Sequence, residues 1–248
     1  MSSLVTVVVR TINRNQSLLS RALKSVELQT YGELETIVVN DGGTSLLNWI
    51  KSYSILDIQL IESQENQGRS AAANLGIKSA KGKYLVFLDD DDFLYPNHID
   101  DLVKVVEGSP VAYCDALRRR ELINQNDCQL MTKELAASEE HSLKRMLEGN
   151  FIPINCLIFE ARVLKANQFD EDLTVLEDWD LLIRLSSEHS FKHLNKIRAE
   201  YSIRVNAKGA SDNTTGNNLD VWQQTAKLLK ERYRPLWEAQ GLNTIPIK

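Results

Sequence analysis

An apolar run that ends in four adjacent carboxylates, Asp89 to Asp92, is the feature that most constrains how this chain folds. Residues 84–88 are uncharged and mostly favour β-structure, which predicts a strand buried on both faces, as in a parallel sheet. The acids then lie at the carboxyl end of that strand, the edge where open α/β sheets bind ligands. Four like charges raise one another's pKa unless something neutralises them, and a divalent cation is the first candidate.

Two earlier apolar runs also end in polar side chains. Residues 4–9 are followed by Arg10 and Thr11, and residues 35–39 by Asn40 and Asp41. In the first half of the chain we expect strands at residues 4–9, 35–40, 58–61 and 84–88, and helices at residues 17–29, 45–53 and 70–80. Such alternation predicts an α/β fold with a doubly wound, mostly parallel sheet flanked by helices. An isolated acidic tetrad is equally compatible with a solvated turn, but the shared sheet edge favours a binding site.

The second half of the chain has a weaker pattern. We expect helices at residues 96–107, 142–147 and 179–185, strands at residues 111–114 and 154–159, and a final helix at residues 219–236. Residues 117–138 are polar and weakly periodic, and residues 205–218 have the composition of a mobile loop. A single domain with a C-terminal helical extension is the expected architecture.

Bulk composition excludes several classes of protein. The net charge of -5 argues against a nucleic-acid partner, because such proteins usually carry a basic stripe. The start lacks the pattern of a secretory signal, and no apolar run reaches the length of a membrane-spanning helix, so the expected location is cytoplasmic. The three cysteines are odd in number and widely spaced, so no disulfide framework is predicted and they are expected to be reduced. The histidines define no metal site.

The acidic tetrad also predicts a kind of ligand. Carboxylate oxygens suit Mg²⁺ or Mn²⁺, which typically bind through few carboxylates together with substrate phosphates. A diphosphate is therefore the natural partner of this edge of the sheet.

Several segments, in order along the chain, resemble family 2 inverting glycosyltransferases of the GT-A fold. Residues 9–14, 23–31 and 37–43 resemble the opening of that family, residues 65–77 its Asn-x-Gly helix, and residues 87–92 its Asp-x-Asp motif. Residues 169–171 and 176–181 resemble its acceptor-side Glu-Asp motif. The resemblance implies a nucleotide-sugar-binding half at residues 1–115, an acceptor-binding half at residues 116–204, and a loop with an amphipathic helix at residues 205–248.

The resemblance implies roles for residues on the donor side. Asp41 matches the aspartate that contacts the base, where a carboxylate accepts the imide N–H of uracil or thymine; a turn aspartate is the alternative. Asp89 matches the acid at the ribose or a metal-bound water, and Asp91 the direct ligand of Mn²⁺ or Mg²⁺. The implied donor-binding set is Thr11, Arg14, Asp41, Arg69, Asp89, Asp90 and Arg204, with Asp91 and Asp89 at the metal.

Arg69 and Arg204 are candidates for the diphosphate, because guanidinium groups bind phosphate oxygens in bidentate fashion. The chain departs from the family's common pattern near both. Ala73 stands where an arginine is common, which leaves Arg69 as its candidate substitute or the contact missing, and Arg204 lies where a histidine is common. For each arginine a surface charge is the alternative.

On the acceptor side, Asp178 matches the general base that takes the proton of the attacking hydroxyl. Glu177 and Trp179 match acceptor-binding positions. Helix capping is the alternative for the acidic pair, and a core position explains the tryptophan equally well. The implied reaction moves a sugar from a nucleoside diphosphate, favouring uridine or thymidine, to a glycan or lipid-linked acceptor. The alternatives are a sugar nucleotidyltransferase and a non-catalytic carbohydrate-binding or scaffolding module.

The final helix has three interpretations. It covers the core of the domain, forms a homodimer contact, or makes a peripheral contact with the inner face of the membrane through Lys227, Lys230, Arg232 and Arg234 beside Trp222 and Trp237.

Overall fold

Four parallel strands form the first half of the sheet, and the sequence predicted all of them. They are β1 (Val5–Thr11), β2 (Leu34–Asp41), β3 (Ile58–Ser63) and β4 (Tyr84–Asp89), in the order β3-β2-β1-β4. Val7, Val8 and Phe87 have no exposed surface, as expected for strands covered on both faces. The register pairs Arg10 of β1 with Asp89 of β4, which brings an arginine beside the first carboxylate of the tetrad.

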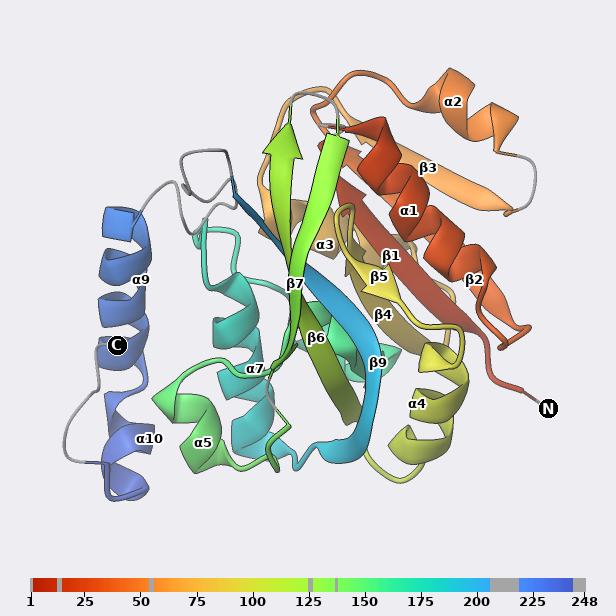
Figure 1. Ribbon diagram of the computed structural model, residues 1–248. Coiled ribbons are helices and arrows are strands. Elements are labelled where there is room, and N and C mark those ends of the chain that lie inside the picture. Colours follow the sequence, from red (N-terminus) through yellow and green to blue (C-terminus); the bar gives the residue numbers. More distant parts are fainter. Residues whose placement is uncertain are drawn as a thin grey trace.

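The computed structural model describes residues 2–12, 15–53, 56–124, 127–136, 138–205 and 219–242 (Figure 1). Arg14, one of the predicted donor-binding residues, lies outside these ranges, as does the expected loop at residues 206–218.

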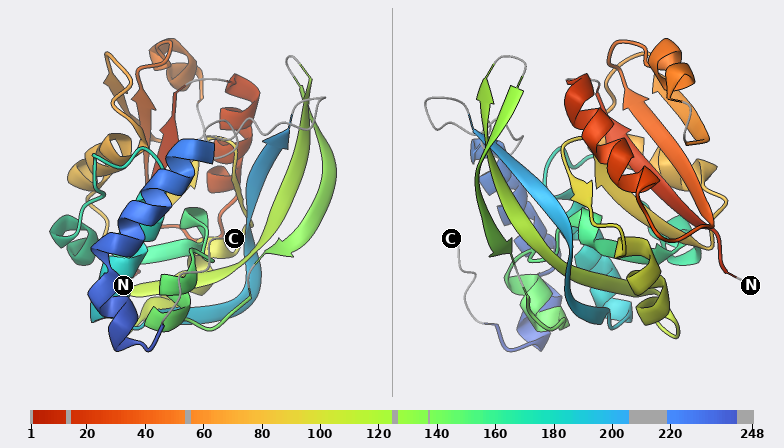
Figure 2. Two further views of the ribbon diagram at one scale, coloured as in Figure 1. Left: turned by 90° about the vertical axis from the view of Figure 1, so that its left-hand side faces the viewer. Right: turned by 45° about the vertical axis from the view of Figure 1, so that its right-hand side comes forward.

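The second half of the sheet is mixed and curls away from the parallel strands (Figure 2). The order continues from β4 through β8 (Leu157–Glu160), β6 (Val111–Asn124), β9 (Lys192–Val205) and β5 (Phe93–Leu94), with β7 (Asp127–Ala136) paired to β6. β8 is antiparallel to β4 and β6, whereas β6 and β9 are parallel. The α/β class is confirmed, and the parallel arrangement is concentrated in the first half.

No strand was predicted within residues 117–138, but this segment forms most of the hairpin of β6 and β7. A bulge between Arg120 and Glu121 shifts the register of the hairpin, and charged pairs such as Arg118 and Glu134 face each other across it. The bulge interrupts the two-residue alternation by which a strand is recognised. β9 was also missed, and the predicted strand at residues 154–159 begins with a 3₁₀ turn (Ile154–Cys156).

The helices mostly agree with the predicted positions. They are α1 (Gln16–Glu27), α2 (Leu47–Ser52), α3 (Arg69–Ser79), α4 (His98–Val106), α5 (Leu143–Glu148), α6 (Ala161–Ala166), α7 (Glu177–Glu188), α9 (Leu219–Arg232) and α10 (Arg234–Ala239). The final helix is broken at Tyr233, just before Pro235 in the first turn of α10, where a missing N–H costs no hydrogen bond. None of the helices in the described ranges combines the length and apolar composition needed to cross a membrane.

Small residues of α3 allow this helix to pack closely against the sheet. Ala72, Ala73 and Gly76 are buried, and α3 lies behind the parallel strands in the view of Figure 1. A Cβ atom on Gly76 would lie 2.3 Å from a methyl carbon of Val8 in β1. The separation of α3 from β1 is therefore set by the absence of a side chain at residue 76.

We expect Gly76→Ala to destabilise the protein by about 1–3 kcal/mol, because the added methyl overlaps a stiff buried valine. Urea denaturation measures the difference. Gly32→Ala is the matched control, since a Cβ there meets no atom within 4 Å. Equal denaturation midpoints for the two variants would contradict the close packing of α3.

Candidate active site

A cavity of about 1480 Å³ lies at the carboxyl ends of β1, β2 and β4 and extends toward α9. Most of the predicted site residues line it: Thr11, Asp41, Arg69, Asp89, Asp90, Asp91, Asp178, Trp179 and Arg204. Glu177 does not line the cavity wall. Segments far apart in sequence, the acidic tetrad and the start of α7, therefore face the same space.

Two arginines neutralise Asp89. Arg10 contacts Asp89 Oδ1 through Nε at 2.8 Å and Nη2 at 2.6 Å, and Arg69 Nη2 contacts Oδ2 at 2.9 Å. Arg69 Nε also lies 3.0 Å from Glu177 Oε1. The charges of Glu177 and Asp89 raise the pKa of Arg69 above its usual value. The two arginines thus join the tetrad to the start of α7.

The other three carboxylates of the tetrad have different partners. Thr11 Oγ1 donates to Asp90 at 2.6 Å, and Arg204 Nε lies 3.0 Å from Asp91 Oδ2. The Ser202 backbone N–H donates to Asp92 at 2.9 Å. Burial raises the pKa of Asp92 well above its ordinary value, and the charges of Asp91 and Asp89 act in the same direction.

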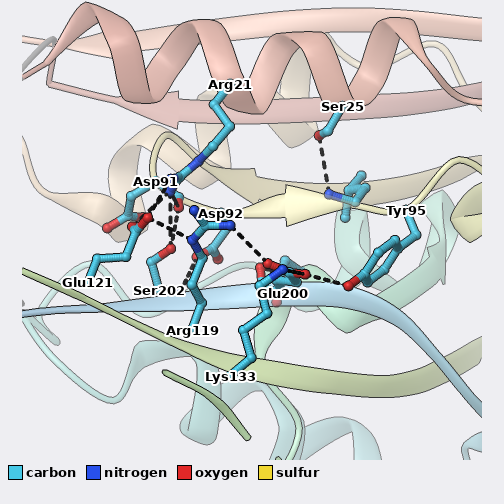
Figure 3. Close-up of polar contacts among 12 residues, drawn as sticks. Arg21, Ser25, Asp91, Asp92, Tyr95, Arg119, Glu121, Lys133, Glu200 and Ser202 are labelled. Atoms are coloured by element: carbon cyan, nitrogen blue, oxygen red, sulfur yellow. Dashed lines mark hydrogen bonds and ion pairs between the residues drawn. The ribbon is translucent and has the colours of Figure 1, made fainter. Parts of the chain in front are cut away.

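A buried ionic network supports the tetrad from the side of α1 (Figure 3). Arg21 donates to both oxygens of Glu121, at 2.7 and 3.1 Å, and to the backbone carbonyl of Asp91 at 2.6 Å. Ser202 Oγ donates to the same carbonyl at 2.5 Å. The position of the Asp91 backbone is therefore fixed by side chains of α1 and β9.

The network continues along the strands of the second half. Arg119 contacts Glu121 at 2.7 Å and Glu200 at 3.2 Å, and Lys133 donates to Glu200 at 2.6 Å (Figure 3). Tyr95 donates to Glu200 as well. Burial raises the pKa of Glu121, but the hydrogen bonds and charges of Arg21 and Arg119 outweigh burial and hold that pKa below its usual value.

The carboxylate of Asp41 anchors the loop that begins α3. It accepts the backbone N–H groups of Gln67 at 3.0 Å and Gly68 at 2.8 Å. Gly42 has a positive φ of 79°, and a Cβ there would lie 2.2 Å from the backbone nitrogen of Asn66. Asp41 therefore holds the distant loop that precedes α3 and also lines the cavity.

Asp178 lies half-buried at the start of α7. Asn150 Nδ2 donates to its Oδ2 at 2.9 Å, and the Trp179 backbone N–H donates to its Oδ1 at 2.8 Å. Burial and the charge of Glu177 raise the pKa of Asp178 to about 6, despite opposing effects of Arg69 and the Trp179 N–H. Such a carboxylate is ionised at neutral pH and accepts a proton readily.

The residue before this helix has an unusual backbone. Leu176 has a φ of 60°, the only positive φ among non-glycine residues of the described ranges. Residues other than glycine rarely adopt this backbone conformation. It persists where surrounding contacts enforce it, often at functional sites. The geometry turns the chain sharply into α7 directly before the acidic pair.

Glu177 and Trp179, the predicted acceptor-binding residues, both make contacts inside the protein. Glu177 is buried against Arg69, with Arg10 Nη1 at 3.7 Å, and faces the tetrad. The indole of Trp179 is 4% exposed and its N–H donates to the Met146 carbonyl at 2.7 Å. The first residue is part of the charge network, and the second is mainly core with an edge at the cavity.

Sequence reasoning missed several residues of the site. Arg10, Arg21, Asn150, Ser202 and Glu121 carry its contacts, yet only Arg10 had a signal, as a charge directly after a β-branched run. The other four depend on contacts between segments at least 28 residues apart.

The donor set fits a divalent cation that completes its coordination with other groups. Asp91 and Asp89 supply hard oxygen donors at the cavity, although Arg204 contacts Asp91 and two arginines contact Asp89. No group of three or more His, Cys, Asp or Glu in the described ranges is arranged to hold a metal by itself. Mg²⁺ and Mn²⁺ commonly bind through one or two carboxylates and substrate phosphates, which is the arrangement that these residues allow.

Comparison with protein families gives a match over most of the chain. Residues 6–165 match the model of glycosyl transferase family 2. An uncharacterized glycosyltransferase of Bacillus subtilis, YwdF, is 27% identical over 98% of this chain and 87% of its own length. An uncharacterized glycosyltransferase of Haemophilus influenzae is 27% identical over 93% of this chain and 77% of its own length.

Solved structures show the same fold. TarS residues 1–349 of S. aureus in complex with UDP matches with a TM-score of 0.65 and 20% identity, over 81% of this chain. The mannosyltransferase PcManGT of Pyrobaculum calidifontis, in complex with GDP-Man and Mn²⁺, matches with a TM-score of 0.65 and 15% identity, over 97% of this chain. The chain spans 60% of the TarS structure and 69% of the PcManGT structure.

The network around Glu121 leads to a prediction about stability. We expect Glu121→Ala to lower the free energy of unfolding by about 3–5 kcal/mol, because it leaves Arg21 and Arg119 without their buried partner. Urea denaturation at neutral pH measures this loss. Glu134→Ala, which removes an exposed partner of Arg118 in the same hairpin, is the control and should change little.

The same variant has a pH dependence of known sign. The depressed pKa of Glu121 stabilises the folded state above the ordinary glutamate pKa, and this contribution is lost as pH falls through the lower folded value. The difference between wild type and Glu121→Ala should therefore shrink in acid. A difference that is absent at neutral pH would contradict the role of the network.

Proposed function

The chain belongs to glycosyl transferase family 2, and we propose that it is a metal-dependent inverting enzyme that moves a sugar from a nucleoside diphosphate to an acceptor hydroxyl. The proposal depends on one observation: the arginine-neutralised tetrad and Asp178, with its pKa of about 6, line the same cavity. The tetrad with its arginines suits the binding of a charged leaving group, and Asp178 suits removal of the proton from the acceptor hydroxyl. Family membership favours sugar transfer over the nucleotidyltransferase and scaffolding alternatives.

The donor occupies the side of the cavity at the ends of β1, β2 and β4. Thr11 and Asp41 lie near the base and ribose, and Arg69 and Arg204 near the diphosphate. Asp41 is saturated in part by the loop of α3, yet each carboxylate oxygen can accept a second hydrogen bond. UDP or dTDP is the favoured carrier on this basis; TarS was solved with UDP, whereas PcManGT was solved with GDP-Man.

Asp91, with Asp89 through water or ribose, would hold Mn²⁺ or Mg²⁺ against the diphosphate. A bound cation of this kind offsets the negative charge that develops on the departing nucleoside diphosphate. Arg10 and Arg69 hold the Asp89 carboxylate in place through ion pairs, and Arg21 and Ser202 fix the Asp91 backbone. These residues thus preorganise the charges before the donor binds.

Asp178 takes the proton of the acceptor hydroxyl as its oxygen attacks the anomeric carbon on the side opposite the leaving group. The N–H groups of Asn150 and Trp179 orient the carboxylate and favour its ionised form. A single displacement of this kind inverts the anomeric configuration. The acceptor is a glycan or a lipid-linked saccharide, and the division into donor and acceptor halves near residue 115 and the cytoplasmic location stay predictions.

We expect Asp178→Asn to reduce sugar transfer about 10²–10⁴-fold, because the amide cannot accept the proton. UDP release from a UDP-sugar measures turnover, and thermal stabilisation by UDP with Mn²⁺ measures donor binding, which should be retained. In the wild type, activity should fall about tenfold per pH unit below a pKa near 6, since only the ionised carboxylate acts as a base. Full activity of the variant would remove Asp178 from the mechanism.

A second prediction concerns the donor and the cation. UDP or dTDP should raise the melting temperature in the presence of Mn²⁺, and EDTA should abolish much of that increase, because a ligand that binds only the native state stabilises it. Asp91→Asn should lose the dependence on Mn²⁺, while Asp100→Asn on the distant helix α4 should keep it. A clear preference for GDP would contradict the proposed role of Asp41.

A further inference from the structure

Helix α9 is attached directly to the helix that carries Asp178. Arg232 Nη1 lies 2.8 Å from Asp170 Oδ2 and 2.8 Å from Asp180 Oδ1, and the hydroxyl of Tyr233 donates to Asp180 at 2.7 Å. Asp180 belongs to α7 and has no exposed surface. Leu229 is also fully buried. One face of α9 is therefore fixed to α7, two residues after the proposed base.

A different face of α9 lines the cavity. Trp222, Gln223, Lys227 and Lys230 are among the cavity-lining residues of this helix. Gln223, Lys227 and Lys230 follow one another at spacings of four and three residues, which places them on adjoining turns. Trp222 is half-buried and packs partly against the core. Lys230 is 7% exposed, and burial lowers its pKa. The helix is thus a wall of the cavity as well as cover for the core.

The membrane interpretation of this helix loses its support from these positions. Trp237 is 2% exposed and Lys230 is buried. Arg232 is held by Asp170 and Asp180, and Arg234 by Glu231. The basic and aromatic residues therefore do not form the continuous exposed face that binding to an anionic membrane requires.

Part of the cavity lining has the chemistry that binds a saccharide. Trp222, Phe151 and Tyr201 present aromatic surface, which packs against the C–H faces of sugar rings. Gln223 and Gln224 offer amide groups that donate to and accept from hydroxyls. The cavity-lining residues of α9 include both basic and acidic side chains, Lys227, Lys230, Asp220 and Glu231, so the wall favours neither a polyanion nor an acyl chain.

We propose that the cavity face of α9 binds the saccharide of the acceptor, with Trp222 as the surface on which a sugar ring stacks and Gln223 and Lys227 as hydrogen-bonding groups. The proposal rests on the proposed function, and it assigns the acceptor side of the same cavity to a helix that lies after the segment matching the family model. Because Arg232 and Tyr233 tie α9 to Asp180, the bound sugar is positioned relative to Asp178 by one connected unit.

The test is binding of the full chain, with UDP and Mn²⁺ present, to an array of immobilised mono- and oligosaccharides. Wild type should bind a subset of them, and Trp222→Ala should bind that subset about tenfold more weakly or worse, as expected for loss of an aromatic anchor. Trp222→Phe should recover most of the binding. Leu228→Ala, an exposed position on the same helix outside the cavity lining, is the matched control and should bind as wild type.

Stabilisation by UDP with Mn²⁺, measured on every variant, confirms that each is folded and binds donor. Equal saccharide binding by wild type and Trp222→Ala would overturn the proposal, as would absence of saccharide binding by a wild type that binds UDP. Sedimentation of wild type with anionic phospholipid vesicles that is lost in Trp222→Ala would also overturn it in favour of a membrane contact. Failure of wild type to bind any nucleoside diphosphate would instead contradict the proposed function.

Discussion

The charge balance at the carboxyl end of β1 and β4 is the constraint on which the site depends. Four consecutive carboxylates at a buried strand end are tolerable only with compensation, because each would otherwise be driven toward its neutral form. Arg10 supplies the first compensation from the neighbouring strand, at the position that the β1–β4 register dictates. Arg69 adds a second from the first turn of α3.

The same compensation connects parts of the site that have different tasks. Glu177 shares Arg69 with Asp89, so the start of α7 is held to the strand end by a common guanidinium. Glu177 also raises the pKa of its neighbour Asp178 through its charge. A residue that the family pattern suggested for the acceptor therefore acts on the ionisation of the proposed base.

The parallel half of the fold could be predicted because its signals are local. Residues 4–9 and 84–88 are continuous apolar runs, and α1 has both helical spacing and an asparagine cap whose side chain accepts from the Ser17 backbone N–H. The β6–β7 hairpin and β9 could not be predicted, because their charged residues pair with one another across strands, as Arg119 does with Glu200. Such pairing is invisible to the periodicity of a single segment. The same distinction holds for the candidate site. The tetrad and Asp178 were proposed from local motifs, whereas Arg21 and Asn150 make contacts with distant segments and were not.

The attachment of α9 to Asp180 limits how this domain can be recombined with others. Asp180 is fully buried and contacts Arg184, Arg232 and Tyr233. A chimera that exchanged the C-terminal helices alone would leave this carboxylate without part of its compensation inside the protein, at a cost of several kcal/mol. Chimeras among related chains should therefore succeed when the segment around Asp170 and Asp180 is exchanged together with α9. The carboxylates and their partners on the C-terminal helices then come from the same parent chain.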